Sequence, residues 1–170
     1  MAQKDINLHM GLGDGKPSPE LTDAIVAEVL AQLGGPKVLG LDKAKKLIEA
    51  VEELARERGK RAVIAVCNAE GNPIAVHVMD GAFLVSYEVA VKKAYTAVAV
   101  RMSTMELSAL CQPGGTFCGL QALDTVITFG GGIPLYANGV IVGGLGISGG
   151  TGEEDHELAL LGAAVFQTLL

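Results

Sequence analysis

Apolar residues recur at every fourth position from Leu21 to Leu33, and charged and polar residues occupy the intervening positions. This spacing predicts an amphipathic helix over residues 18–33. Ser18 supplies a capping hydroxyl, and Pro19 suits the first helical position because it lacks the N–H that would have no partner there.

The predicted helix is flanked by segments without periodicity. Residues 1–17 are polar and glycine-rich, which predicts a flexible tail, and Gly34–Pro36 predicts a linker. We therefore expect a tail, helix and linker over residues 1–37 and a main domain over 38–170. A helix of this length is marginal alone in water, so its apolar stripe needs a surface. That surface belongs to its own domain, to a sister subunit, or to another protein that the helix docks on.

In the main domain the hydrophobic period alternates between helical and strand spacing. Two hairpins are expected, one around the turn at 69–73 and one around Asn138-Gly139. Strands paired in hairpins with helices grouped between them favour an α+β fold with an antiparallel sheet. The pattern predicts helices at 42–58, 84–101, 103–110 and 153–170, and strands at 61–68, 74–79, 126–129, 133–137 and 140–147.

Glycine is abundant, with 23 residues, and one cluster matches a nucleotide-binding motif by its letters. Gly144 to Gly149 reads G-x-G-x-x-G, but no strand and no ribose-binding acid follow it, which argues against a dinucleotide fold. We interpret Gly143, Gly144 and Gly146 instead as marking either a distortion of the strand or the close approach of another backbone, in part through subunit packing.

Charge and cysteine content exclude several classes of protein. Thirteen Lys and Arg against 19 Asp and Glu give a net charge of −6, which argues against a nucleic-acid partner. Neither a signal peptide nor a membrane-spanning run is evident, so we expect a cytoplasmic protein with no membrane partner. The spacing of Cys111 and Cys118 matches no zinc motif, and with Cys67 they are expected to be reduced thiols, Cys118 in an exposed loop.

Candidate ligand-binding residues fall in two groups. Lys93 lies in an otherwise apolar helix and either reaches the surface or lines an anion pocket with Thr96 and Arg101. The turn at 149–152 begins a helix and either caps itself or holds a carboxylate. The full set of candidates is Asp80, Lys93, Thr96, Arg101, Gly114, Gly115, Gly149, Gly150 and Thr151.

The histidines offer a weaker metal hypothesis. His156 with Glu153 and Glu157 could hold a divalent metal, or the three form a solvated helix start. His77 lies in the middle of a predicted strand and is a further candidate. No Ser-His-Asp arrangement is present, so no catalytic residue is assigned.

An ordered set of motifs adds a resemblance to these inferences. Together the motifs resemble the GlcG/HbpS-like haem-binding family, which includes the C-terminal domain of PduO-type cobalamin adenosyltransferases. The stretches are Leu41-Asp-Lys-Ala-Lys-Lys-Leu-Ile, Asn68-Ala-Glu-Gly-Asn-Pro, Met79-Asp-Gly-Ala-Phe, Lys93-Ala-Tyr-Thr-Ala, Gln112-Pro-Gly-Gly, Phe129-Gly-Gly-Gly-Ile-Pro-Leu and Gly146-Ile-Ser-Gly-Gly-Thr followed by Asp155.

The resemblance implies a profilin-like sandwich with a five-stranded antiparallel sheet flanked by helices, assembled as a homo-oligomer, commonly an octamer. It also implies haem as the cofactor. In some members the haem-ligating histidine lies near the first domain helix, but residues 41–58 contain none. The axial ligand would then be His77, His156, Cys118 or Tyr95.

These observations favour a non-catalytic haem- or tetrapyrrole-binding accessory protein, associated with a cobalamin-dependent diol or glycerol pathway or with glycolate use. The helix at 18–33 is similar to the encapsulation peptides of bacterial microcompartment cargo, which implies a shell protein as partner and a location inside the compartment. Two alternatives stay open: an enzyme acting on a small carboxylate or hydroxy compound, and a structural or adaptor subunit without a ligand.

Overall fold

The computed structural model describes residues 18–32 and 38–170, and it divides the chain into two units at residues 36 and 37. In the first unit, helix α1 (Pro19–Gln32) forms where the spacing predicted it. The backbone N–H of Leu21 donates to the Ser18 hydroxyl at 3.2 Å, which confirms the expected cap. The predicted tail at 1–17 and the linker lie outside the described residues.

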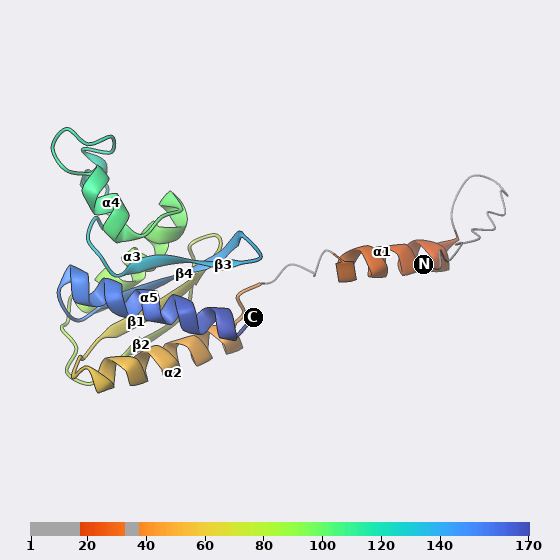
Figure 1. Cartoon of the computed structure of the whole chain (residues 1–170), viewed down its shortest axis with the longest axis horizontal. Helices are drawn as coiled ribbons and strands as arrows, with labels where there is room; N and C mark the ends of the chain where they lie inside the picture. Colours follow the sequence, from red (N-terminus) through yellow and green to blue (C-terminus); the bar gives the residue numbers. More distant parts are fainter. Residues whose placement is uncertain (1–17, 33–37) are drawn as a thin grey trace, which may run out of the picture. The chain divides into compact units, whose positions relative to one another are not determined.

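The second unit contains the elements that the hydrophobic pattern predicted, except for one strand (Figure 1). The four strands form one antiparallel sheet in the order β2-β1-β4-β3. The elements are α2 (Leu41–Glu57), β1 (Val63–Asn68), β2 (Pro73–Val78), α3 (Ser86–Val100), α4 (Thr104–Leu110), the 3-10 turn η1 (Leu120–Ala122), β3 (Gly132–Ala137), β4 (Val140–Ser148) and α5 (Gly152–Thr168).

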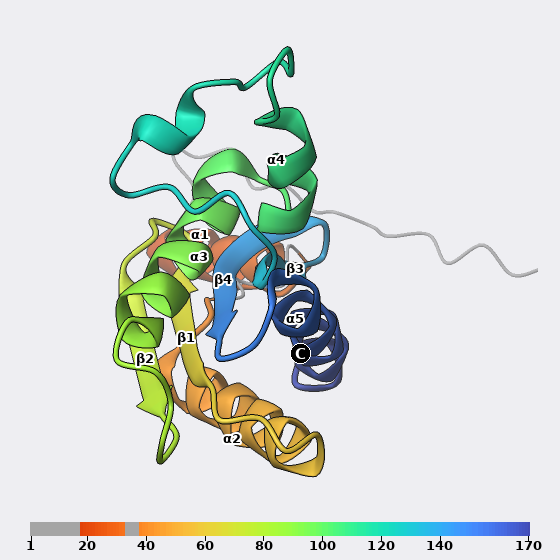
Figure 2. The same cartoon turned by 90° about the vertical axis from the view of Figure 1, so that its left-hand side faces the viewer.

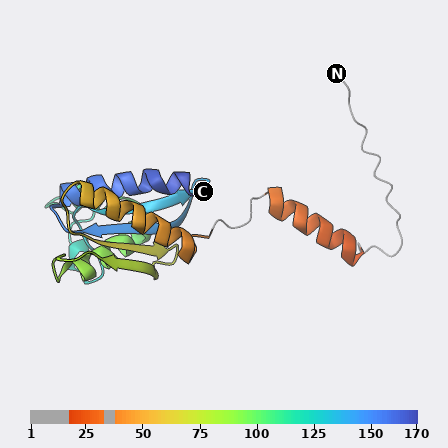
Figure 3. The same cartoon turned by 90° about the horizontal axis from the view of Figure 1, so that it is seen from below.

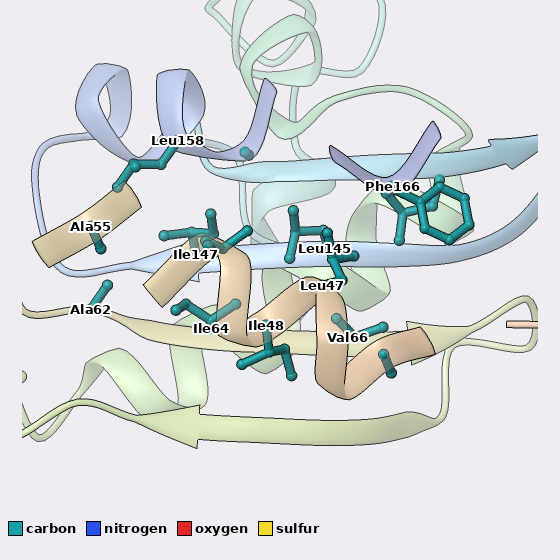
Figure 4. Close-up of a cluster of buried hydrophobic side chains, with 14 of the residues drawn as sticks. Leu47, Ile48, Ala55, Ala62, Ile64, Val66, Leu145, Ile147, Leu158 and Phe166 are labelled. Atoms are coloured by element: carbon teal, nitrogen blue, oxygen red, sulfur yellow. The ribbon is translucent and has the colours of Figure 1, made fainter. Parts of the chain in front are cut away.

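The sheet separates two layers of helices. Helices α2 and α5 cover one face and α3 covers the other, as Figures 2 and 3 show from two directions. Side chains alternate along β1, so that Ile64 and Val66 face α2 and α5 while Val63 and Ala65 face α3. The larger cluster of buried apolar residues therefore lies between the sheet and the α2–α5 layer (Figure 4).

Glycines in β4 allow α3 to lie directly on the sheet. A Cβ at Gly146 would overlap the carbonyl oxygen of Ala90, and one at Gly144 would overlap that of Ala94. The predicted approach of another backbone is therefore confirmed, and the backbone is α3 of the same chain. Glycine is required here because the helix carbonyls occupy the space that a side chain would fill.

The predicted strand at 126–129 is wrong, and the sheet of the described residues has four strands instead of the expected five. The backbone N–H of Ile127 donates to the Thr96 hydroxyl on α3 at 3.0 Å. The N–H of Val126 donates to the carbonyl of Leu123, closing a turn. These donors are used locally, so the segment does not pair with a strand.

The α+β class and the antiparallel sheet are confirmed, and the profilin-like arrangement stays a prediction.

Two local predictions are confirmed in detail. Asn138 and Gly139 have φ of 52° and 77°, as expected for the turn that joins β3 to β4. Ser103 and Glu106 form a reciprocal capping box at the start of α4. None of the described helices is long and apolar enough to cross a membrane.

Candidate functional site

Lys93 is fully buried, on the face of α3 that meets the sheet. Its ammonium donates to Asp155 Oδ2 at 2.7 Å and to the carbonyl of Ile147 at 2.8 Å, and lies 4.7 Å from the centroid of the Phe129 ring. Burial lowers the pKa of Lys93 more than the Asp155 carboxylate raises it. Lys93 therefore neither reaches the surface nor lines a pocket, but forms an internal ion pair between α3 and α5.

Glycines make the room for this ion pair. A Cβ at Gly131 would lie 2.7 Å from Lys93 Nζ and 2.7 Å from Asp155 Cβ. Gly131 also has a φ of +118°, which residues with a side chain rarely adopt. The buried ion pair thus explains the glycine at position 131, just before β3.

Thr96 is also used inside the fold. Its hydroxyl donates to the carbonyl of Lys92 at 2.7 Å and accepts from the N–H of Ile127 at 3.0 Å. The charge of Lys93 is balanced by Asp155, and the Thr96 hydroxyl is used in hydrogen bonds within the fold. The predicted pocket of Lys93, Thr96 and Arg101 is therefore not assembled. Of the three, Arg101 alone lines a groove.

The turn before α5 caps its own helix. Thr151 and Glu154 form a reciprocal capping box, and the N–H of Gly150 donates to Asp155 Oδ1 at 2.9 Å. The carbonyl oxygen of Arg61 lies 2.6 Å from the position of a Cβ at Gly149. The backbone donors that would hold a carboxylate are thus partly engaged with side chains of α5.

The metal candidates lie apart. His77 on β2 places its Nδ1 2.9 Å from Glu52 Oε1 on α2. His156 and Glu153 lie on α5, and Glu153 is exposed. Within residues 18–32 and 38–170, no three His, Cys, Asp or Glu side chains gather in a way that could hold a metal ion.

The remaining candidates lie at the surface. Asp80 lines a charged depression that also includes Arg61. Gly114 and Gly115 follow α4, and a Cβ at Gly115 would overlap the carbonyl of Leu110. Gly114 has a φ of +85°, so the turn itself explains that glycine.

A groove of about 670 Å³ lies between the start of α4, strand β3 and helix α5. We call it the histidine groove, because His156 lines it and the Nδ1 atom of that residue is buried without a hydrogen-bond partner among the described residues. Its volume lies within the ~300–1,000 Å³ typical of small-molecule sites. The lining residues are Arg101, Met102, Ser103, Glu106, Ile133, Pro134, Leu135, Tyr136, His156, Leu160, Ala163, Ala164 and Gln167.

Glu106 lies at the α4 side of the histidine groove. Ser103 donates to its carboxylate from both the backbone N–H, at 2.9 Å, and the hydroxyl, at 2.8 Å. These bonds, and to a smaller extent the charge of His156, hold the pKa of Glu106 below its ordinary value. The carboxylate is therefore ionised near neutral pH and engaged by Ser103.

A second groove, of about 660 Å³, lies at the C-terminal end of α3. We call it the tyrosine groove, because Tyr95 and Tyr136 line it. It shares Arg101 and Tyr136 with the histidine groove, so the two cavities meet at these residues. Its lining consists of Ala69, Glu70, Gly71, Tyr95, Val98, Ala99, Arg101, Tyr136, Gly139, Val140 and Ile141.

Sequence reasoning identified Arg101, His156 and Tyr95 but missed Tyr136 and Glu106. In β3, Tyr136 is an exposed position between the buried Leu135 and Ala137. Alternation in a strand indicates such exposure but says nothing about what the exposed side chain lines. Both missed residues come from elements that meet only in the folded chain.

The fold and grooves define a small α+β domain in which a sheet lies between helical layers and two ligand-sized grooves meet at one arginine. The family model described as haem degrading protein HbpS-like matches residues 39–164. The chain belongs to the HbpS-like family, which confirms the resemblance inferred from the motifs.

Three relatives illustrate the match. An uncharacterized 15.0 kDa protein from the dhaT-dhaS intergenic region of Citrobacter freundii is 40% identical over 121 residues, 70% of this chain and 85% of that protein. Corrinoid adenosyltransferase PduO of Salmonella typhimurium is 40% identical over 126 residues, 73% of this chain but only 38% of PduO. The crystal structure of a PduOC–haem complex superposes with a TM-score of 0.72 at 40% identity, covering 75% of this chain and 94% of that one.

Proposed function

We propose that this protein binds haem in the histidine groove, with His156 as an axial ligand. Family membership and the similarity to a PduOC–haem complex support haem as the ligand class. The observation that carries the assignment to this groove is that His156 lines it while the Nδ1 atom of the same ring has no hydrogen-bond partner among the described residues. A buried polar nitrogen without a partner is costly unless something else binds it.

The residues of the histidine groove fit a porphyrin. Leu160, Ala163 and Pro134 supply apolar surface for the macrocycle. Arg101 lines the same groove and offers a cation for propionate groups. Haem iron commonly takes a histidine ligand, and when bound it would supply redox and gas-ligand chemistry.

The other candidate axial residues fit less well. The Nδ1 of His77 is already paired with Glu52, and no groove described above includes His77. Cys118 is exposed in the loop after α4, and Tyr95 lines the other groove. We therefore rank His156 first.

The test is a hemin titration of the full chain, followed at the Soret band. His156→Ala should weaken binding at least tenfold and shift the Soret maximum, whereas His77→Ala, the matched control, should leave both unchanged. Wild-type binding that His156→Ala does not alter would refute the ligand assignment. Absence of any Soret change in the wild-type protein would refute haem binding itself.

We also propose that copies of the chain associate through an exposed apolar patch at the start of α3. Leu84 is 98% exposed, and Phe83, Val85 and Tyr87 are each more than half exposed. Contiguous exposed apolar side chains typically mark interaction surfaces. Light scattering of the wild-type protein should give the mass of an oligomer, which is an octamer by family resemblance. Leu84→Glu should reduce the measured mass. A monomeric mass for the wild-type protein would contradict the proposed association.

For α1 we propose a microcompartment shell protein as partner, which would place the protein inside that compartment. Within α1, the side chains of Leu21, Ile25 and Val29 are about half exposed, and they form the apolar stripe that such a partner would contact. A reporter fused to residues 1–37 should localise to shells in a shell-producing host, and the same fusion carrying Ile25→Glu should stay diffuse. Diffuse signal from the unmodified fusion would refute the proposal.

A further inference from the structure

The tyrosine groove contains three polar groups that the fold leaves unused. Among the described residues, the guanidinium of Arg101 makes no hydrogen bond and no ion pair, and the same holds for the Tyr95 and Tyr136 hydroxyls. The polar groups of Lys93 and Thr96, by contrast, are fully engaged in the fold. The unused groups come from α3 and β3 and line one cavity of about 660 Å³.

Arg101 adopts a conformation that costs energy. It ends α3 with φ 58° and ψ 32°, the left-handed region that glycine and asparagine usually supply at this position. Strain of this kind recurs at ligand sites because the surrounding structure maintains a needed geometry. Here it places the arginine at the junction of the two grooves.

The walls of the tyrosine groove suit a planar ligand. A Cβ at Gly71 would lie 2.7 Å from the Tyr95 ring, so the β1–β2 turn presses against that ring and fixes it. Val98 and Val140 add apolar surface. A cavity whose walls are partly apolar and aromatic, and whose lining holds one cation, Arg101, favours an aromatic body that carries one anionic group.

The charged residues of the tyrosine groove indicate how many anionic groups its ligand carries. Arg101 presents a planar fork of donors that matches a carboxylate. Glu70 lines the same groove and would repel a second negative charge. The lining thus favours a monocarboxylate over a dicarboxylate.

We propose that the tyrosine groove binds a small aromatic monocarboxylate, with the carboxylate on Arg101 and the ring against Tyr95 and Tyr136. This site shares Arg101 and Tyr136 with the proposed haem position, but it does not require haem. A ligand here would use the strained arginine that the fold itself leaves without a partner.

Tyrosine fluorescence gives a direct test, because the chain has three tyrosines and no tryptophan. The haem-free full chain is titrated with benzoate and, in separate experiments, with three comparison compounds. Acetate lacks the ring, benzyl alcohol lacks the charge, and terephthalate carries a second carboxylate. We expect saturable quenching by benzoate and at least tenfold weaker binding of the other three.

Two variants locate the site. Arg101→Lys keeps the charge but loses the planar fork, and should weaken benzoate binding at least fivefold; Arg101→Gly removes the cation without backbone strain, and should abolish it. Arg58→Lys, at an exposed arginine that follows α2 and lies outside the groove, is the matched control, and no change is expected. The proposal is refuted if benzoate does not bind at millimolar concentration, or if Arg101→Gly, folded by circular dichroism, binds it like the wild type.

Discussion

The ion pair between Lys93 and Asp155 should be a major determinant of stability. Lys93→Met leaves the Asp155 carboxylate buried without its countercharge, and Asp155→Asn leaves the ammonium in the same position. Removing one partner of a fully buried pair costs about 3–5 kcal/mol. Because domains of this size are stable by roughly 5–15 kcal/mol, each single variant should lose a large share of its stability.

The double variant distinguishes pairing from packing. Lys93→Met with Asp155→Asn removes both charges, and the asparagine oxygen keeps the acceptor for the Gly150 N–H. We expect the double variant to be less destabilised than the sum of the singles by about 2–3 kcal/mol. Urea unfolding, followed by far-ultraviolet circular dichroism, gives the free energy of unfolding of the wild type, the two single variants and the double variant. Lys92→Met, which removes a solvent-exposed pair with Glu88, is the control and should change that free energy little. Additive single effects would refute the reasoning.

The same lysine predicts a pH dependence. The pKa of Lys93 is lowered below 10.5 by burial, so the folded chain loses this proton at a lower pH than the unfolded chain. Between the folded pKa and 10.5 the unfolded state binds more protons, and stability contributed by this group therefore rises with pH. Lys93→Met should lack this rise; a wild-type curve parallel to that of Lys93→Met across alkaline pH would contradict it.

Two further predictions concern packing and thiol chemistry. Gly146→Ala should lower the free energy of unfolding by about 1–3 kcal/mol, because its Cβ would overlap α3, whereas Gly152→Ala, whose Cβ would have its nearest neighbour at 3.3 Å, should cost less. Burial raises the pKa of Cys67 to about 11, so a thiol reagent at pH 8 should label exposed Cys118 and leave Cys67 unmodified, as mass spectrometry of the folded protein would show. Rapid labelling of Cys67 would mean that α3 opens from the sheet.

Local signals were sufficient for most of the fold. The apolar period at 84–101 predicted α3 to within two residues at each end, and Asn138-Gly139 predicted the hairpin of β3 and β4. The strand predicted at 126–129 failed for a reason that the local sequence does not contain. The N–H of Val126 is satisfied by a turn, and that of Ile127 by Thr96, 31 residues away in the chain.

The site was less predictable, because its chemistry depends on pairs distant in sequence. A lysine in an apolar helix signalled that Lys93 needs a partner, but nothing marked Asp155, 62 residues further on, as that partner. Once the two are paired, the anion pocket predicted around Lys93 loses its charge. Of the predicted pocket residues, Arg101 is then the cation that still lines a cavity. This role could be recognised only once the folded structure had shown the partners of Lys93 and Thr96.

Arg101 also connects the two proposed ligands. It lines both grooves together with Tyr136, so one guanidinium can serve the propionates of a haem or the carboxylate of a smaller ligand, but not both fully. Benzoate should therefore weaken hemin binding in the wild-type protein, and the effect should vanish in Arg101→Gly even where hemin still binds through His156. Competition that persists in Arg101→Gly would mean that benzoate enters the histidine groove itself, and the two cavities would then be one site.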